Sequence, residues 1–217
     1  MYTRRAALTA GTVVAVSLAG CVDFVTGRGP LTAESEPAGI SEAVLEETGY
    51  ELDDRRLDRM AETVELAGVT REVEVTNWQS IYNRSIDLPV VGPLETAAFV
   101  VITTPAVEIA GRTLNPLAQF GPEELIDLIA SEYEELEDAE PAGEDSWTML
   151  GEPTDVARFV GETRVLGQSI DVIAHLGTGR SGDDFVIGLS IYPELAADAE
   201  ADRAEALFGG IEHPIAP

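Results

Sequence analysis

The sequence contains one cysteine, Cys21, no lysine and only two histidines. A single cysteine cannot form a disulfide within the chain, so a packed core has to stabilise the folded domain. Neither His175 nor His213 has further ligands at metal-binding spacing. The phosphate-binding loop, the serine-hydrolase elbow and the zinc-protease helix motif are also missing. The residues therefore predict no catalytic residue, no metal site and no cofactor.

No apolar run reaches the roughly 20 residues that a membrane span needs. The run from residue 6 to residue 18 is short and rich in Ala, Gly, Thr and Ser. It lies between paired arginines and small residues before a cysteine, which together predict a twin-arginine export signal with a lipobox. The signal residues are Arg4, Arg5, Leu18, Ala19, Gly20 and Cys21. We expect residues 1–20 to be removed and a lipid on Cys21 to hold the protein at the outer face of the cell membrane. A buried N-terminal helix is the alternative, but this run has no N-cap and contains a glycine.

The charge of the chain is strongly negative. There are 40 acidic residues against 13 basic ones, all arginine, and the net charge is −27, although 45% of the residues are hydrophobic. Such charges repel one another in ordinary buffer but are screened in molar salt, where the Debye length is about 3 Å. Acid excess without lysine is typical of proteins from extreme halophiles. A surface that binds cations or basic partners is the alternative, but the acids are spread along the chain. The charge also argues against binding to nucleic acid.

The first half of the domain reads as one helix and several strands. Residues 21–37 are expected to be a lipidated tether, and residues 38–217 a single globular domain. Ser41 and Gly49 would bound a short helix. A hairpin follows, from Leu57–Leu66 to Arg71–Thr76, with a bulge expected near Asn77–Trp78. The apolar segment 97–104 predicts a central strand that is covered on both faces.

The second half alternates helix, meander and helix. Pro122 begins an amphipathic helix, and an acidic loop is expected at residues 139–145. The apolar face of the helix consists of Leu125, Ile126, Ile129, Tyr133 and Leu136. The strands of the meander are expected at Trp147–Leu150, Val156–Leu166, Ser169–Leu176 and Phe185–Tyr192, with a loop at Gly177–Asp184. A last helix runs from Asp198 to Phe208. These elements predict an α+β fold: an antiparallel sheet of about six to seven strands with helices packed on its faces.

Smaller features suggest sites of lower specificity. Asn83 begins an Asn-Arg-Ser sequon in an expected loop and is a candidate for N-glycosylation. Asp183 and Asp184 follow a glycine turn, and whether they bind a cation stays open. His175 is interpreted as a structural or surface residue, and His213 as an exposed residue of the C-terminal tail.

Several motifs together resemble a family of haloarchaeal lipoproteins of unknown function. They are Glu47–Tyr50, Arg71–Asn77, Thr104–Val107, Asn115–Pro116, Asp183–Val186 and Tyr192–Pro193. The resemblance covers nearly all of the chain after the signal and implies an archaeal, membrane-anchored protein, without known catalytic residues. The order of elements is also similar to PsbP/Mog1-like domains, which implies an α/β/α sandwich that acts as a binding or assembly module.

These observations leave three hypotheses about function. The first is a non-catalytic module that binds an envelope protein or a small ligand. The second is an extracellular hydrolase that works with paired carboxylates, which need no histidine or cysteine. The third is a passive component of the cell envelope.

Overall fold

A computed structural model describes most of the chain after residue 29. The described residues are 30–66, 69–88, 92–109, 112–113, 117, 120–132, 136–165 and 168–217. The elements in chain order are β1 (Leu31–Glu34), β2 (Gly39–Ile40), α2 (Glu42–Thr48), β3 (Glu51–Leu66), β4 (Val69–Leu88), β5 (Gly92–Pro105), β6 (Glu108–Ile109), β7 (Arg112–Thr113), α3 (Pro122–Glu132), β8 (Glu137–Met149), β9 (Glu152–Val165), β10 (Gln168–Ser181), β11 (Asp184–Pro193), η2 (Glu194–Ala196), α4 (Ala197–Gly209) and β12 (Ile211–Glu212).

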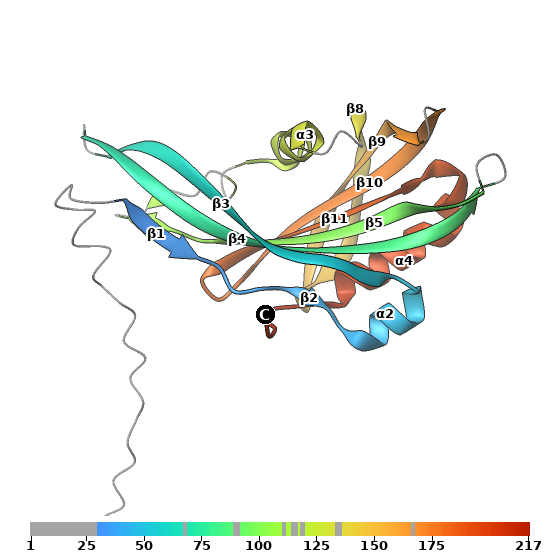
Figure 1. Ribbon diagram of the computed structural model, residues 1–217, viewed down its shortest axis with the longest axis horizontal. Helices are drawn as coiled ribbons and strands as arrows, with labels where there is room; N and C mark the ends of the chain where they lie inside the picture. The colour runs from blue at the N-terminus through green and yellow to red at the C-terminus, as the bar shows by residue number, and fades with distance from the viewer. Residues whose placement is uncertain are drawn as a thin grey trace, which may run out of the picture.

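One eight-stranded sheet dominates the molecule (Figure 1). Across it the strands follow the order β3-β4-β5-β11-β10-β9-β8, and every neighbouring pair is antiparallel. The eighth strand, β1, pairs in parallel with β4. The predicted sheet with helices on its faces is therefore present, but its strands are longer than expected and the fold is richer in strand. Segment 97–104 lies in β5 between β4 and β11, as predicted for a central strand.

The strands β1 and β5 share one side of β4, one after the other. β1 pairs with Val73–Thr76, and β5 pairs with β4 from Trp78 onward. Ser35 fills the junction: its backbone N–H donates to the carbonyl of Thr76 at 3.0 Å, and its hydroxyl lies 3.0 Å from both the carbonyl oxygen and Oγ1 of Thr103. The tether expected up to residue 37 therefore cannot extend that far, because Leu31–Glu34 already belong to the sheet.

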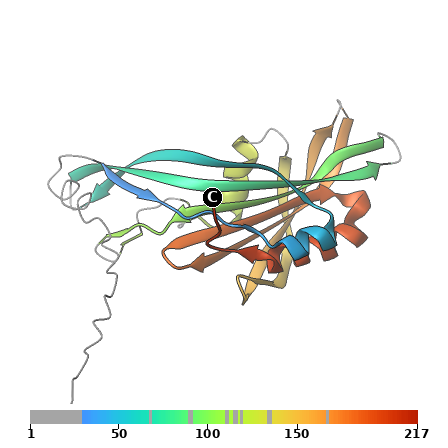
Figure 2. The same cartoon turned by 60° about the horizontal axis from the view of Figure 1, so that its bottom comes forward.

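Helices cover both faces of the sheet. α3 packs on one face, where its side chains join a core with residues of β5, β9, β10 and β11. α2 and α4 pack on the other face, and Figure 2 shows them side by side. α2 ends at Gly49, whose φ of 73° is the left-handed conformation predicted for this stop. Among the described residues, no helix has the length and apolar character required to span a membrane.

The ring of Phe208 in α4 requires glycine at two positions of the sheet. It packs edge-on against Phe99, with ring centroids 5.2 Å apart. A Cβ added to Gly177 or to Gly188 would lie 2.9 Å or 2.7 Å from this ring. The loop predicted to begin at Gly177 is therefore wrong: this glycine makes room for an aromatic ring within a strand. β10 continues to Ser181, and only residues 182–183 form the turn.

Two further predictions about local structure are wrong. The acidic segment 139–145 forms part of β8 rather than a loop. β8 is an edge strand with register shifts at Glu137/Glu140 and Pro141/Gly143, and such edges tolerate proline, glycine and like charges. The register irregularities of β4 lie at Leu52/Asp54 opposite β3 and at Arg84/Ser85 opposite β5, so no bulge occurs at Asn77–Trp78.

Candidate functional site

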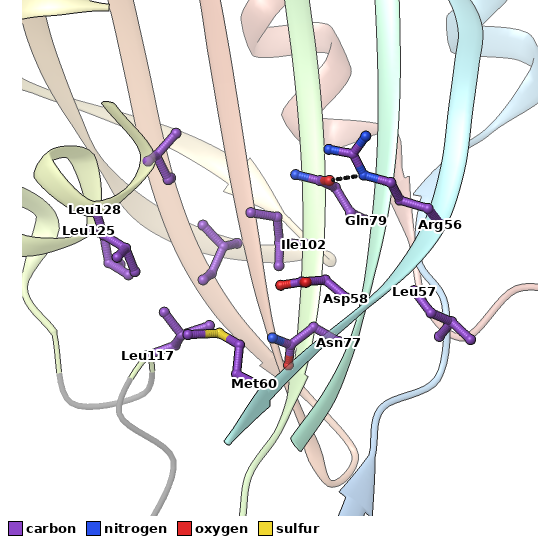
Figure 3. A pocket seen from close by; sticks show the side chains of 12 residues that line it. Arg56, Leu57, Asp58, Met60, Asn77, Gln79, Ile102, Leu117, Leu125 and Leu128 are labelled. Atoms are coloured by element: carbon purple, nitrogen blue, oxygen red, sulfur yellow. Dashed lines mark hydrogen bonds between the residues drawn. The ribbon is translucent and has the colours of Figure 1, made fainter. Parts of the chain in front are cut away.

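A cavity of about 490 Å³ lies between α3 and the sheet (Figure 3). It is lined by Arg56, Leu57, Asp58, Met60, Asn77, Gln79, Ile102, Leu117, Leu125, Leu128, Ile129 and Ile187. In Figure 3 the polar side chains come from β3 and β4 on one side, and Leu117, Leu125 and Leu128 lie on the other. The cavity therefore has one polar wall and one apolar wall.

The apolar wall follows from the pattern of α3 and the two central strands. Leu125 and Ile129 are four residues apart and so share one face of the helix, and both are buried. Ile102 of β5 and Ile187 of β11 are paired across the sheet and point to the same face. Of the helix face predicted from sequence, Leu125, Ile126, Ile129 and Leu136 are buried, and Tyr133 lies outside the described residues.

The polar wall follows from the register of β3 and β4. Arg56 lies opposite Gln79, and Asp58 lies opposite Asn77. Side chains at directly opposite positions point to the same face, so all four face the cavity. The Arg56 Nε donates to Gln79 Oε1 at 2.8 Å, and its Nη1 lies 3.5 Å from Asp54 Oδ2. The guanidinium of Arg56 is therefore already held within the protein.

Asn77 carries a buried side-chain acceptor that no described residue satisfies. The residue is 2% exposed, and its Oδ1 has no hydrogen-bond partner within the described part of the chain. Leaving a buried acceptor unpaired costs about 1–3 kcal/mol. Asp58, its neighbour on β3, is exposed at the cavity. The carboxylate of Asp58 thus faces the cavity, whereas the Oδ1 atom of Asn77 has almost no accessible surface.

His175, predicted to be structural or on the surface, is buried on the opposite face of the sheet. Its Nε2 donates to Asp145 Oδ2 at 3.3 Å, and its Nδ1 accepts from the hydroxyl of Tyr192 at 3.4 Å. The ring also packs against Trp147, with centroids 4.6 Å apart. Burial lowers the pKa of His175 to about 4, although Asp145 acts in the opposite direction. The ring is therefore neutral at pH 7 and joins strands β8, β10 and β11.

The prediction that His213 is exposed is wrong. Its side chain is 3% exposed, and its Nε2 lies 3.2 Å from Asp184 Oδ2. The same carboxylate accepts from the backbone N–H of Glu36 at 2.8 Å, and burial raises the pKa of Asp184. Asp184 is thus used inside the fold while Asp183 is exposed in the turn. Within the described ranges no cluster of three or more metal-ligating side chains occurs.

Within the described part of the chain, the buried carboxylates of Asp184 and Glu200 do not form the facing pair that the hydrolase hypothesis requires. Glu200 in α4 is 1% exposed and binds Arg84, Arg203 and the hydroxyl of Tyr50. This network joins α4 to β4 and to the end of α2. Neither Glu200 nor Asp184 lines the cavity.

The remaining sites predicted from sequence lie elsewhere. Asn83 is half-buried within β4, next to the irregularity at Arg84/Ser85, and not in a loop as expected. Its glycosylation stays a prediction. The signal residues and Cys21 lie outside the described residues.

The cavity was not predicted from the sequence, because the polar residues of its wall interrupt the apolar alternation of the strand. Val73, Val75, Asn77 and Gln79 occupy the same face of β4, but the two amides look like outward positions. The sequence does carry a signal for the site: two amide residues, two positions apart, continue the alternating row that Val73 and Val75 begin.

Comparisons with solved structures give distant likenesses. The crystal structure of PA94 from Pseudomonas aeruginosa, a protein of unknown function and putative regulator, matches with a TM-score of 0.33 and 13% identity, covering 72% of this chain and 96% of that one. LpqN of Mycobacterium tuberculosis, described as involved in cell envelope biogenesis, matches with a TM-score of 0.37 and 12% identity, covering 81% of this chain and 97% of that one. No curated protein matches the chain. A family model described as a domain of unknown function, DUF6517, matches residues 37–212.

Proposed function

The chain belongs to the family of domain of unknown function DUF6517, and from this premise we propose that it is a non-catalytic binding module for a small, largely apolar ligand. The observation that carries the proposal is the cavity between α3 and the sheet, with one apolar wall and one wall that carries polar side chains of β3 and β4. Cavities of about 300–1,000 Å³ with apolar walls and a few convergent polar groups are typical of small-molecule sites.

The arrangement supports binding rather than hydrolysis. Among the described residues, the cavity presents one carboxylate, Asp58, whereas acid–base hydrolysis by carboxylates needs two. The arginine at the cavity, Arg56, is bound to Gln79 and Asp54. A second candidate function therefore has no specific observation in its favour.

We also propose the setting in which the module works. The Arg4, Arg5 and Cys21 motif supports export and a lipid anchor on Cys21 at the outer face of the cell membrane, and the acidic, lysine-free composition supports a haloarchaeal source. An envelope protein would then be a further partner. A Cys21→Ser chain is expected to be lost from the membrane fraction, and unchanged membrane attachment would refute the anchor.

Helices on both faces of the sheet support a PsbP/Mog1-like α/β/α sandwich.

Binding of an uncharged fluorescent probe tests the proposed function. N-phenyl-1-naphthylamine should gain fluorescence with the protein in molar salt. Leu128→Trp places a bulky ring in the cavity and should reduce probe affinity at least tenfold. Leu195→Trp is the matched control, since Leu195 is 80% exposed and does not line the cavity. Equal probe binding by both variants would exclude this cavity as the site.

A further inference from the structure

Resting on the proposed function, we propose that the ligand of this cavity is an uncharged amphiphile whose head group carries hydroxyl groups. The head group would lie between Arg56 and Asp58 of β3, and the apolar body would lie against α3. The proposal concerns the chemical class of ligand, which neither the family nor the similar structures assign.

The first step is the pair of charged side chains in the polar wall. Among the described residues that line the cavity, the charged ones are Arg56 and Asp58. They stand two residues apart on β3, so their side chains leave the strand on the same face. The Arg56 side chain is 50% exposed, and Asp58 is also exposed. A head group bound at this wall can therefore contact both.

The second step is the position of the Arg56 guanidinium. Its Nε donates to Gln79 Oε1 at 2.8 Å, and Gln79 lies directly opposite on β4 (Figure 3). Gln79 is 7% exposed, so the bond holds one edge of the guanidinium against a buried side chain. A side chain that is already held in place loses less conformational entropy when a ligand binds. The wall thus presents a hydrogen-bond donor in a fixed position.

The third step is the kind of hydrogen bond that each charged group can form. A guanidinium only donates, and an ionised carboxylate only accepts. A head group in contact with both must therefore accept from Arg56 and donate to Asp58. An ammonium group has no acceptor for Arg56, and a carboxylate has no donor for Asp58, whereas a hydroxyl group both accepts and donates. Molar salt screens charges that lie farther apart than a Debye length, but these hydrogen bonds are direct contacts.

The fourth step is the absence of charge on the head group. A zwitterion can also accept and donate, but it brings two ionised groups to the edge of an apolar cavity. Removing an ionised group from water costs far more than removing a hydroxyl group. The facing wall consists of Leu117, Leu125 and Leu128, which form no hydrogen bond with their side chains (Figure 3). This wall favours an alkyl body, and the polar wall favours hydroxyl groups.

Five probes of equal chain length test the head group. 1,2-Octanediol, 1-octanol, octylammonium, octanoate and the zwitterion 2-aminooctanoate are titrated calorimetrically into the full-length protein in molar potassium chloride at pH 7. The diol should bind at least threefold more tightly than octanol and at least tenfold more tightly than the three charged probes. A cavity without a matching polar wall would favour octanol, because a second hydroxyl group is costly to remove from water. A diol that binds no more tightly than octanol, or than any charged probe, would overturn the proposal.

Two variants test whether the head group contacts the polar wall. Asp58→Asn supplies an N–H donor at this position, so octanoate should bind at least fivefold more tightly than to the unaltered chain. Arg56→Gln supplies a carbonyl acceptor, so octylammonium should gain at least fivefold. Asp53→Asn and Arg59→Gln make the same charge changes on β3 at residues that do not line the cavity, and they should leave every affinity within twofold.

The outcomes separate this proposal from the proposed function. If Asp58→Asn and Arg56→Gln leave the affinities of octanoate and octylammonium unchanged, the uncharged head group at this wall is refuted, while the cavity stays a binding site for the naphthylamine. If none of the five probes binds and Leu128→Trp has no effect on the naphthylamine, the proposed function fails as well. Thermal unfolding checks that each variant is folded, and the order of the five probes on the unaltered chain decides the proposal without any variant.

Discussion

His175 shows what burial does to one titratable side chain in this protein. Its ring is packed between Trp147 and Tyr192, and its pKa falls to about 4 from an ordinary value of 6.5. In the unfolded chain the ring is exposed and regains the ordinary pKa. Folded and unfolded states therefore bind different numbers of protons between these two pH values.

This difference makes stability depend on pH in a defined direction. Between pH 6.5 and about 4 the unfolded state binds the proton first, so the free energy of unfolding should fall as the pH falls. The full loss is about 3 kcal/mol, at roughly 1.4 kcal/mol for each pH unit. Denaturant unfolding of the native chain and of His175→Gln over this range measures it. A stability difference between the two chains that stays constant from pH 7 to pH 4 would contradict the assignment.

The polar wall of the cavity shows why the site could not be derived from the sequence. Asn77 and Gln79 are buried, but as polar residues they look as though they face solvent, so the alternation seemed to shift. A strand normally buries apolar residues, and a buried amide is expected only where function or a partner requires it. The pairing of Asn77 with Asp58 depends on the register of β3, which the sequence does not show.

At the scale of elements, the contact between α4 and the sheet depends on Gly188. A Cβ there would lie 2.7 Å from Phe208 and 3.2 Å from Ile211. Gly188→Ala should therefore lower the free energy of unfolding by about 2 kcal/mol, since overpacking of a dense core costs about 1–3 kcal/mol.

A second glycine of the same region provides the control. At Gly209 the nearest atom to an added Cβ is a backbone oxygen at 3.9 Å, an ordinary contact. Gly209→Ala should be neutral or slightly stabilising because alanine favours helix. Thermal unfolding of both variants measures the difference, and equal midpoints would show that Phe208 moves aside easily.

Elements with strong local patterns were predicted well, and elements defined by tertiary contacts were not. The α3 helix and the central strand β5 carry apolar patterns that only one placement satisfies. By contrast, β8 contains Pro141 and Gly143 and reads as a loop, because only pairing with β9 at the sheet edge makes it a strand. Likewise Gly177 reads as a turn, although it only makes room for Phe208.

At the scale of the whole molecule, the net charge of −27 should make stability depend on salt. The Debye length is about 3 Å at 1 M salt and about 10 Å at 0.1 M, so repulsion between distant carboxylates grows as salt is removed. The folded state is more compact than the unfolded chain and suffers more from this repulsion.

Thermal unfolding in a series of potassium chloride concentrations tests this expectation. The midpoint should fall steadily from 1 M to 0.1 M salt, as the Debye length grows from about 3 Å to about 10 Å. The ratio of near-ultraviolet to far-ultraviolet circular dichroism follows the loss of tertiary packing. A midpoint that does not change across the series would contradict adaptation to high salt.

The junction around β1 has a mechanical consequence. If the chain is held at its N-terminal end, any pull reaches the sheet first at Leu31–Glu34. These residues pair in parallel with β4, so a force along the strand loads several hydrogen bonds together in shear rather than one after another. Ser35 then transfers the load to β5 through Thr103, and Glu36 transfers it to β11 through Asp184. Residues 31–36 are thus bonded to three strands. Tension on the N-terminal end would therefore be carried to the middle of the sheet and would not separate an edge strand from it.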